Sequence, residues 1–268
     1  MSGRLENKVA LVVGGGSGMG RAGAVAMAAE GARVAVADID LARAEVVAGS
    51  CGGTAVALAV DVCDTASVER MVDVTVERFG RIDVVYHCAV DVAFVNTQDR
   101  RLTELDEAVW TRMIDLCLTG VFRVVKHAGR QMLKQQSGSI ILSSTVDALV
   151  GCAGLDSYTA AKGGVTALTR SLAAGLAPDG IRVNAIAPSF VSSEPQKVWL
   201  EDDASRTTIE QLHLLEIPTP EEVAPLVVFL AGDESRRMTG TVIPLDSGYM
   251  AFKAKLDVMG AMQANADS

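Results

Sequence analysis

The chain has 268 residues, of which 49% are hydrophobic and 21% charged, and its formal net charge is −9. This apolar content is sufficient for a large buried core, so we expect one globular domain over residues 1–268 and no disordered chain. The negative charge disfavours nucleic acid and membrane surfaces as partners. A polar N-terminus without a long apolar stretch leads us to expect a cytoplasmic protein without an anchor.

The five cysteines and three histidines are widely spaced along the chain. None of them forms a CxxC, CxxH or HxxxH pattern, so local spacing gives no zinc site and no metal is expected. An odd number of scattered cysteines is typical of reduced thiols in the cytosol.

Strand-like and helix-like segments alternate from the first residues onward. An apolar, β-branched run at 8–13 leads into a glycine-rich turn and then an alanine-rich helix at 21–30. Further strands are predicted at 33–37, 54–60, 82–87, 139–142, 182–187 and 241–245, and further helices at 41–49, 66–79, 106–135, 157–176 and 220–231. This order requires parallel strands with right-handed crossovers. The predicted fold is therefore α/β, a single Rossmann-type doubly wound parallel sheet of about seven strands flanked by helices.

Two segments, 90–105 and 189–219, fit neither strand nor helix of this sheet. Long loops in compact domains usually carry function. We therefore expect both to cover a substrate, with 189–219 as a lid. Residues 250–268 form a C-terminal extension that docks on a neighbouring subunit or frays.

The glycine turn indicates a phosphate-binding loop. Gly14, Gly18 and Gly20 lie between a strand and a helix, where the backbone can approach a pyrophosphate at the helix N-terminus. Asp38 ends the next strand and can accept bonds from an adenosine ribose, while it repels a 2′-phosphate. NAD is therefore favoured over NADP. Asp61 and Val62 follow the third strand and can border the adenine. The alternative for Asp61 is a helix cap or a loop carboxylate before the next helix.

Tyr158 and Lys162 lie four residues apart on one face of a predicted helix. A lysine ammonium there can lower the pKa of the tyrosine. Ser143 and Ser144 end the preceding strand, at the sheet edge where open α/β folds bind ligands. YxxxK pairs are common on exposed helices, but the order of the glycine turn, Asp38, Ser144 and this pair favours catalysis.

Other motifs accompany these residues in a fixed order: Leu118-Thr119-Gly120-Val121-Phe122, Ile181-Arg182-Val183-Asn184-Ala185-Ile186-Ala187-Pro188, Pro220-Glu221-Glu222-Val223-Ala224 and Asp246-Ser247-Gly248. With them the chain resembles the short-chain dehydrogenase/reductase family from Lys8 through Tyr249. The resemblance implies that Tyr158 is the general acid/base, that Ser144 polarises the substrate oxygen, and that Lys162 holds the nicotinamide ribose.

The resemblance also implies a set of cofactor contacts and an assembly. The family usually forms tetramers or dimers, so a homo-oligomer is expected. The implied contacts to the dinucleotide come from Gly14, Ser17, Gly18, Met19, Gly20, Asp38, Ile39, Asp61, Val62, Ala89, Tyr158, Lys162, Pro188, Val191 and Ser193.

The chain departs from the family pattern in four places. His87-Cys88-Ala89-Val90 stands where the family has Asn-Asn-Ala-Gly, and Cys117 replaces an Asn whose carbonyl holds a water in a proton relay. Val13 and Ser189 replace a Thr and a Gly. A strand-end histidine is more often structural than catalytic, and both cysteines are expected to pack as small hydrophobes.

The sequence therefore predicts an NAD-dependent oxidoreductase that interconverts a secondary alcohol and a ketone. A medium-sized, mainly apolar substrate is expected. Its pocket is predicted within 91–96, 145–155 and 190–215, with Phe94, Leu149, Cys152, Leu155, Phe190, Trp199, Leu200, Leu214, Asp91 and Asp147, and with Asp156 just beyond. Two alternatives are an NADPH-dependent 3-oxoacyl reductase and a dinucleotide-binding regulatory or scaffold protein whose catalysis has decayed.

Overall fold

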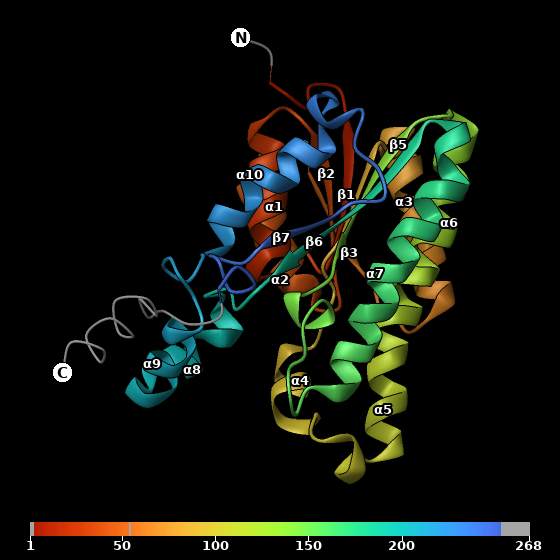
Figure 1. The fold of residues 1–268 in the computed structure, drawn as a ribbon. Coiled ribbons are helices and arrows are strands. Elements are labelled where there is room, and N and C mark those ends of the chain that lie inside the picture. Colours follow the sequence, from red (N-terminus) through yellow and green to blue (C-terminus); the bar gives the residue numbers. More distant parts are fainter. Residues whose placement is uncertain (1–2, 54, 253–268) are drawn as a thin grey trace, which may run out of the picture.

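A seven-stranded parallel sheet forms the centre of the protein (Figure 1). The computed structural model describes residues 3–53 and 55–252. The strand order is β3-β2-β1-β4-β5-β6-β7. Successive strands are added toward one edge of the sheet up to β3 and toward the other edge from β4 onward, so the topology switches between β1 and β4. The strands are β1 (Val9–Val13), β2 (Arg33–Asp38), β3 (Val56–Ala59), β4 (Val84–His87), β5 (Gly138–Ser143), β6 (Ile181–Pro188) and β7 (Val242–Leu245). Every predicted strand is confirmed, although Thr54, the first residue of one prediction, lies outside the described residues.

Helices cover both faces of the sheet (Figure 1), which confirms the doubly wound Rossmann-type fold. On one face lie α1 (Gly18–Ala29), α2 (Leu41–Ser50) and α10 (Pro220–Ala231). On the other lie α3 (Thr65–Phe79), α6 (Gly120–Gln135) and α7 (Asp156–Leu176). Two further short turns, η4 (Ala177–Asp179) and η6 (Asp233–Ser235), end α7 and α10.

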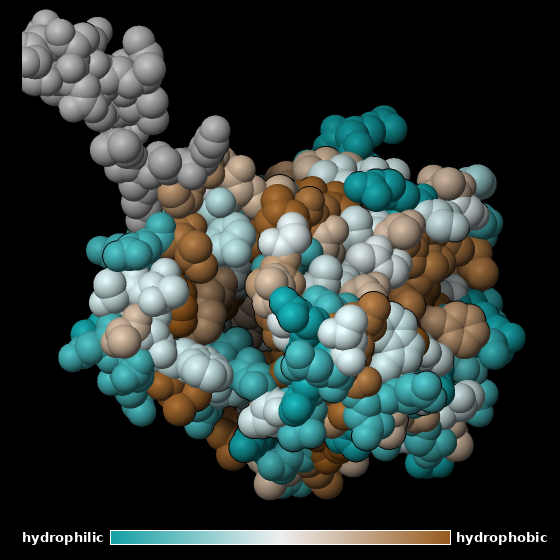
Figure 2. All heavy atoms as spheres, turned by 60° about the horizontal axis from the view of Figure 1, so that its bottom comes forward, coloured by the Kyte–Doolittle hydropathy of each residue, from teal (hydrophilic) through white to brown (hydrophobic). Residues whose placement is uncertain are grey.

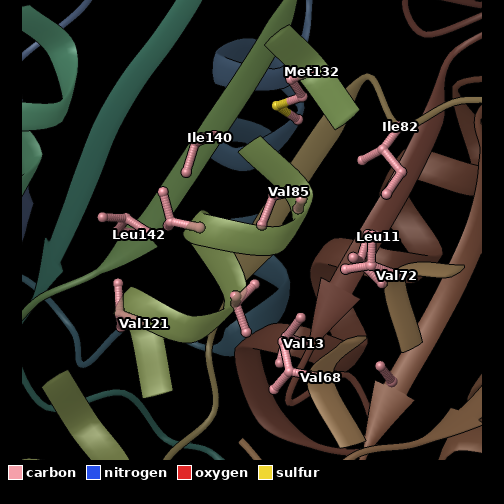
Figure 3. Packing of buried hydrophobic residues seen from close by; sticks show 14 of the residues in the cluster. Leu11, Val13, Val68, Val72, Ile82, Val85, Val121, Met132, Ile140 and Leu142 are labelled. Carbon is pink, nitrogen blue, oxygen red and sulfur yellow. The ribbon is translucent and has the colours of Figure 1, made fainter. Parts of the chain in front are cut away.

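The core consists of one apolar layer on each face of the sheet. In a strand successive side chains alternate between faces, so Leu11 and Val13 of β1 both point toward α3. There they pack with Val68 and Val72, and Val121 of α6 closes the same layer (Figure 3). Burying each such side chain contributes roughly 1.5–3 kcal/mol. This packing fixes the positions of the strand ends that carry the site.

The long predicted helix at 106–135 is continuous but not uniform. Asp106 caps α5 (Glu107–Ile114) by accepting from the backbone N of Ala108 at 2.7 Å. A π-helical turn, η2 (Asp115–Thr119), then joins α5 to α6, and Cys117 is fully buried inside it. Such a turn inserts one residue into the helix and changes the direction of its backbone groups. The apolar periodicity of the segment gave no sign of it.

The two segments outside the sheet fold into short helices at one end of the molecule (Figure 1). The first contains α4 (Val92–Gln98) and η1 (Leu102–Glu104), and the second contains η5 (Glu194–Gln196), α8 (Lys197–Glu201) and α9 (Asp203–Gln211). The side chain of Asn96 donates to that of Gln196 at 3.1 Å, so the two segments meet. Most of the predicted C-terminal extension, residues 253–268, lies outside the described residues.

Candidate active site

A cleft of about 1590 Å³ follows the carboxyl ends of the central strands. Figure 2 shows the face with the short helices, and its surface is hollowed near the centre. A cleft of this size can hold a ligand larger than a typical drug molecule. All the residues predicted to bind the cofactor or to catalyse line this one cleft: Gly14, Ser17, Gly18, Met19, Gly20, Asp38, Ile39, Asp61, Val62, Ala89, Ser144, Tyr158, Lys162, Pro188, Val191 and Ser193.

The glycine turn leaves room only for backbone. Gly14 has φ 77° and Gly18 φ 50°, in the left-handed region that favours glycine. A Cβ on Gly14 would lie 2.6 Å from the backbone of Ala89, and one on Gly20 would overlap the carbonyl oxygen of Gly14. The side chain of Ser17 makes no capping bond, so the first amides of α1 remain available to an anion. The turn therefore fits the pyrophosphate of a dinucleotide.

Asp38 is held at the end of β2 by backbone donors. One carboxylate oxygen accepts from the backbone N of Gly16 at 2.8 Å and the other from the backbone N of Asp40 at 3.0 Å. A carboxylate has about four acceptor positions, so two remain for a ribose diol. Arg43 of α2 also lines the cleft, paired with Asp40 at 3.3 Å. Arg43 was not among the residues predicted from the sequence to contact the cofactor.

Asp61 borders the cleft and does not cap α3. Asp64 is the capping residue, because its carboxylate accepts from the backbone N of Ala66 at 3.0 Å and of Ser67 at 3.2 Å. Asp61 instead accepts from the backbone N of Cys63 at 2.8 Å. The capping alternative for Asp61 is therefore excluded.

Tyr158 and Lys162 lie on successive turns of α7. The Lys162 Nζ is 5.7 Å from the centre of the Tyr158 ring and donates to the carbonyl oxygen of Ser143 at 2.8 Å. An ammonium has three donors, so two remain for other oxygens in the cleft. Lys162 is 2% exposed, and its stem fills the space between α7 and β5.

A distant carboxylate fixes the start of α7. Asp99, after α4, accepts from the backbone N of Tyr158 at 2.9 Å and from the backbone N and hydroxyl of Ser157 at 3.2 and 2.8 Å. In return Asp156 accepts from the backbone N of Leu102 at 2.7 Å. The residue at the N-cap position of α7 makes no side-chain cap of its own. The position of Tyr158 therefore depends on the segment after α4.

The expected lowering of the Tyr158 pKa is not found. Burial raises the pKa of Tyr158 well above its ordinary value, and the nearby Cys117, Asp147 and Cys88 raise it further. The Lys162 ammonium is hydrogen-bonded to a carbonyl and not to the phenol, so it does not offset the desolvation of the phenolate. In this environment Tyr158 is neutral at neutral pH and can donate a proton.

The geometry also corrects the expectation for Ser144. Its hydroxyl is turned into α7, 2.7 Å from the hydroxyl of Thr166 and 3.2 Å from the carbonyl oxygen of Lys162. Thr145, the next residue, lines the cleft together with Tyr158 and also lines a second pocket beside it. Ser144 was expected to end the strand, whereas β5 ends at Ser143 and Thr145 is the N-cap residue of the turn η3 (Val146–Ala148).

Comparisons with known proteins agree with this geometry. A family profile described as enoyl-(acyl carrier protein) reductase matches residues 14–250. The chain is 37% identical to a 3-oxoacyl-[acyl-carrier-protein] reductase of Thermotoga maritima, over 92% of this chain and 99% of that protein. It is 38% identical to a 3-alpha-(or 20-beta)-hydroxysteroid dehydrogenase of Mycobacterium tuberculosis, over 99% and 98%. The crystal structure of levodione reductase is similar with a TM-score of 0.85 and 30% identity, over 92% and 100%.

The chain belongs to the short-chain dehydrogenase/reductase family. The members of this family are oxidoreductases that use nicotinamide dinucleotides. None of the helices within residues 3–53 and 55–252 combines the length and apolarity of a membrane span. The same residues contain no group of His, Cys, Asp or Glu side chains arranged to bind a metal.

Of the residues that depart from the family pattern, four are buried: Val13, His87, Cys88 and Cys117. Val90 and Ser189 are partly exposed and line the cleft. Burial and the neighbouring Lys162 lower the pKa of His87 to about 3, and its Nε2 has no hydrogen-bond partner among the described residues. The Cys88 Sγ lies 3.2 Å from the Ser143 hydroxyl. Cys117 is 0% exposed and packs with Met113. These positions agree with neutral packing groups, as expected from the sequence.

The second pocket, of about 330 Å³, lies between η3, α7 and the lid. The predicted residues Asp147, Cys152, Leu155, Phe190 and Trp199 line it, whereas Phe94, Leu149, Leu200 and Leu214 do not. His213 also lines it and lies within the predicted range 190–215, although it was not singled out there. Val90, Ser189 and Tyr249 line it from outside the predicted ranges.

His213 joins the end of the lid to Ser189, the first residue of the lid. Its Nδ1 lies 2.7 Å from the carbonyl oxygen of Ile209 and its Nε2 lies 2.9 Å from the hydroxyl of Ser189. Its ring is 5.4 Å from that of Tyr249, so the last described turn also touches the lid. Ser189, noted only as a replacement for a family Gly, could have drawn attention to a lid contact. The spacing of residues along the sequence did not indicate that His213 is the partner of Ser189.

Proposed function

We propose that the protein is an NAD-dependent oxidoreductase that interconverts a secondary alcohol and a ketone on a medium-sized, mainly apolar substrate. One observation carries the proposal: Tyr158 and Thr145 both line the junction between the long cleft and the second pocket. A dinucleotide in the cleft and a substrate in the pocket would meet at these two side chains. Relatives named hydroxysteroid dehydrogenase and levodione reductase support a carbonyl or alcohol substrate.

The nicotinamide, when bound, supplies the hydride chemistry. Tyr158 moves the proton, because its phenol is the titratable group that borders both spaces. Thr145 positions the reacting oxygen, since it lines both spaces together with Tyr158. Lys162 holds ribose hydroxyls with the two ammonium donors that the Ser143 carbonyl leaves free.

The raised pKa of Tyr158 gives the two directions different pH dependences. Reduction of a ketone needs the protonated phenol, which is the form favoured at neutral pH. Oxidation of an alcohol needs the phenolate, so its rate rises with pH. The same raised pKa therefore favours reduction near neutral pH and oxidation in alkali.

The preference for NAD rests on Asp38. Its carboxylate is fixed where a ribose diol would bind, and a 2′-phosphate there would meet a negative charge. Arg43 at the rim of the cleft, paired with Asp40, is the observation that favours the alternative, an NADPH-dependent 3-oxoacyl reductase. Calorimetric titration with both cofactors separates the two: tighter binding of NAD supports the proposal, and tighter binding of NADPH contradicts it.

Turnover of secondary alcohols, followed by the absorbance of the reduced nicotinamide, tests the activity. Tyr158→Phe is expected to lower kcat by about 10²–10⁴, the usual contribution of a general acid or base. Tyr86→Phe is the matched control, because Tyr86 is fully buried in β4 and lines neither the cleft nor the second pocket. Full activity in Tyr158→Phe would refute the assignment. A protein that binds NAD but oxidises no alcohol would support the decayed regulatory or scaffold alternative.

We also infer a cytoplasmic homo-oligomer of a single domain, a tetramer or a dimer. Phe122 on α6 is 52% exposed, and the Nζ of Lys126 lies 5.6 Å from the centre of its ring. An exposed aromatic side chain on a long surface helix supports an interface there. Sedimentation of the wild type and of Phe122→Glu tests it: a smaller species is expected for the variant, and an unchanged monomer in both would contradict assembly.

A further inference from the structure

We propose that the second pocket selects a compact substrate with a second hydrogen-bond donor, a hydroxyl or an ammonium group, close to the reacting carbinol, and that Asp147 accepts from this donor. The inference rests on the proposed function, because Tyr158 and Thr145 define where the carbinol lies. It adds the chemical class of the substrate, and it names a residue that discriminates between substrates.

Asp147 supplies an acceptor inside the pocket. It lies in η3, is half-buried and lines the second pocket. Burial raises the pKa of its carboxyl, while hydrogen bonds from Thr145 and Cys152 lower it. No Lys, Arg or His among the described residues forms an ion pair with it. A partly desolvated carboxylate without a cation gains most from a donor that a ligand brings.

The carboxylate retains room for such a donor. Its Oδ2 accepts from the hydroxyl of Thr145 at 3.0 Å, and Cys152 is its second side-chain donor. A carboxylate has about four acceptor positions, so two donors leave it unsaturated. The carbonyl oxygen of Pro188, at 3.5 Å, is the more distant acceptor for the Thr145 hydroxyl. The hydroxyl of Thr145 and the carboxylate of Asp147 are therefore linked by a hydrogen bond, and both oxygens can still accept from a ligand.

The position of this pair sets the spacing of the two substrate groups. Thr145 meets the reacting oxygen, and Asp147 lies one hydrogen bond farther from it. A donor on the carbon next to the carbinol, or on the one after that, would reach Asp147 while the carbinol contacts Tyr158. A vicinal diol and a vicinal amino alcohol both have this spacing.

The remaining lining rejects anionic substrates. No Lys or Arg side chain within residues 3–53 and 55–252 lines the second pocket, so a carboxylate or phosphate there would face Asp147 without a counter-charge from these residues. The nitrogens of His213 are already engaged by Ile209 and Ser189. The volume, about 330 Å³, lies at the small end of ligand pockets and suits a single ring or a short chain.

A panel of cyclohexane derivatives with matched rings tests the inference. The probes are cyclohexanol, cyclohexane-1,2-diol, 2-aminocyclohexanol and 2-hydroxycyclohexanecarboxylate. For the wild type we expect kcat/KM for the diol or the amino alcohol to exceed that for cyclohexanol by about tenfold or more, because hydrogen bonds to charged groups are strong. The carboxylate should be the poorest substrate. Asp147→Ala should bring the diol and the amino alcohol to within about threefold of cyclohexanol.

Asp73→Asn is the control variant, because it removes one negative charge from an exposed position on α3, away from the pocket. It should leave the substrate preference unchanged. Calorimetric binding of the same four compounds in the presence of NAD gives a second readout that does not require turnover. It should show the same order of affinities, and Asp147→Ala should abolish that order.

The outcomes separate this inference from the proposed function. Equal activity on cyclohexanol and the diol, or a preference that persists in Asp147→Ala, overturns the role of Asp147 but leaves the alcohol dehydrogenase activity intact. A preference for the hydroxy acid overturns it as well. If no alcohol is oxidised, the proposed function fails, and the binding order alone then decides whether Asp147 recognises a donor.

Discussion

The two sides of the cleft are built in different ways. On the cofactor side, the turn between β1 and α1 forms its surface from backbone, with glycines where a Cβ would collide. On the substrate side, side chains from η3, α7, the end of β6, the lid and the last described turn converge. The glycine turn is one contiguous segment, whereas the substrate side exists only when distant segments meet. The glycine turn is therefore locally encoded, and the substrate side can change by single side-chain substitutions.

The largest expected effect comes from changing the cofactor side. In Gly20→Ala the new Cβ would overlap the carbonyl oxygen of Gly14, which is backbone and cannot rotate away. We expect a loss of about 5 kcal/mol in the free energy of unfolding, at the exceptional end for one substitution, and loss of NAD binding.

Urea unfolding and calorimetry with NAD measure both effects. Gly49→Ala is the control, because its Cβ would meet nothing within 4 Å and alanine favours a helix interior. A Gly20→Ala protein that folds and binds NAD normally would show that the turn does not depend on close backbone contact.

A smaller effect is expected from His87, at the end of β4 between the two sides. Its pKa is about 3 in the folded protein and near 6.5 when unfolded, so the unfolded chain binds the proton first as the pH falls. His87 therefore costs no stability above pH 6.5, and the folded state loses stability between pH 6.5 and 3.

In His87→Asn this part of the acid destabilisation should disappear. The difference between the two proteins in their loss of stability from pH 7 to pH 4 should be at most about 3 kcal/mol. Urea unfolding at both pH values measures it. Parallel losses in both proteins would contradict a buried, neutral His87.

A third change affects the substrate side alone. Asp99→Ala removes the bonds to the backbone N of Ser157 and Tyr158, and a lost helix cap typically costs about 0.5–2 kcal/mol. Because Tyr158 is displaced, kcat should also fall, while the affinity for NAD should not. Asp64→Ala removes the cap of α3 and should cost similar stability with an unchanged kcat. Equal kcat in both variants would show that Asp99 only caps α7 and does not position Tyr158 for catalysis.

The same difference between the two sides explains what the sequence could predict. Alternating apolar segments predicted all seven strands and the main helices, because parallel α/β units are encoded by local periodicity. The glycine spacing and Asp38 predicted the cofactor side because its residues lie close together in the chain. The sequence alone could not decide whether Asp61 caps α3, and the structure shows that Asp64 is the capping residue.

The substrate side required the tertiary structure. The π-helical turn around Cys117 and the cap of α7 by Asp99 leave no mark in hydrophobic periodicity. His213 and Tyr249 belong to different segments and meet only through the lid. The hydroxyl of Ser144 is engaged by Thr166, a contact that spacing along the strand could not show.

Kinetic comparison of Thr145→Val with Ser144→Ala tests most directly how the substrate side is built. Thr145→Val removes a hydroxyl at the junction that Tyr158 also lines and should lower kcat/KM about 10²-fold, the usual loss for a group that stabilises a reacting oxygen. Ser144→Ala removes a hydroxyl bonded within α7, so it should reduce stability but leave kcat/KM of the folded enzyme within about threefold. A large loss in Ser144→Ala together with an active Thr145→Val would contradict this assignment.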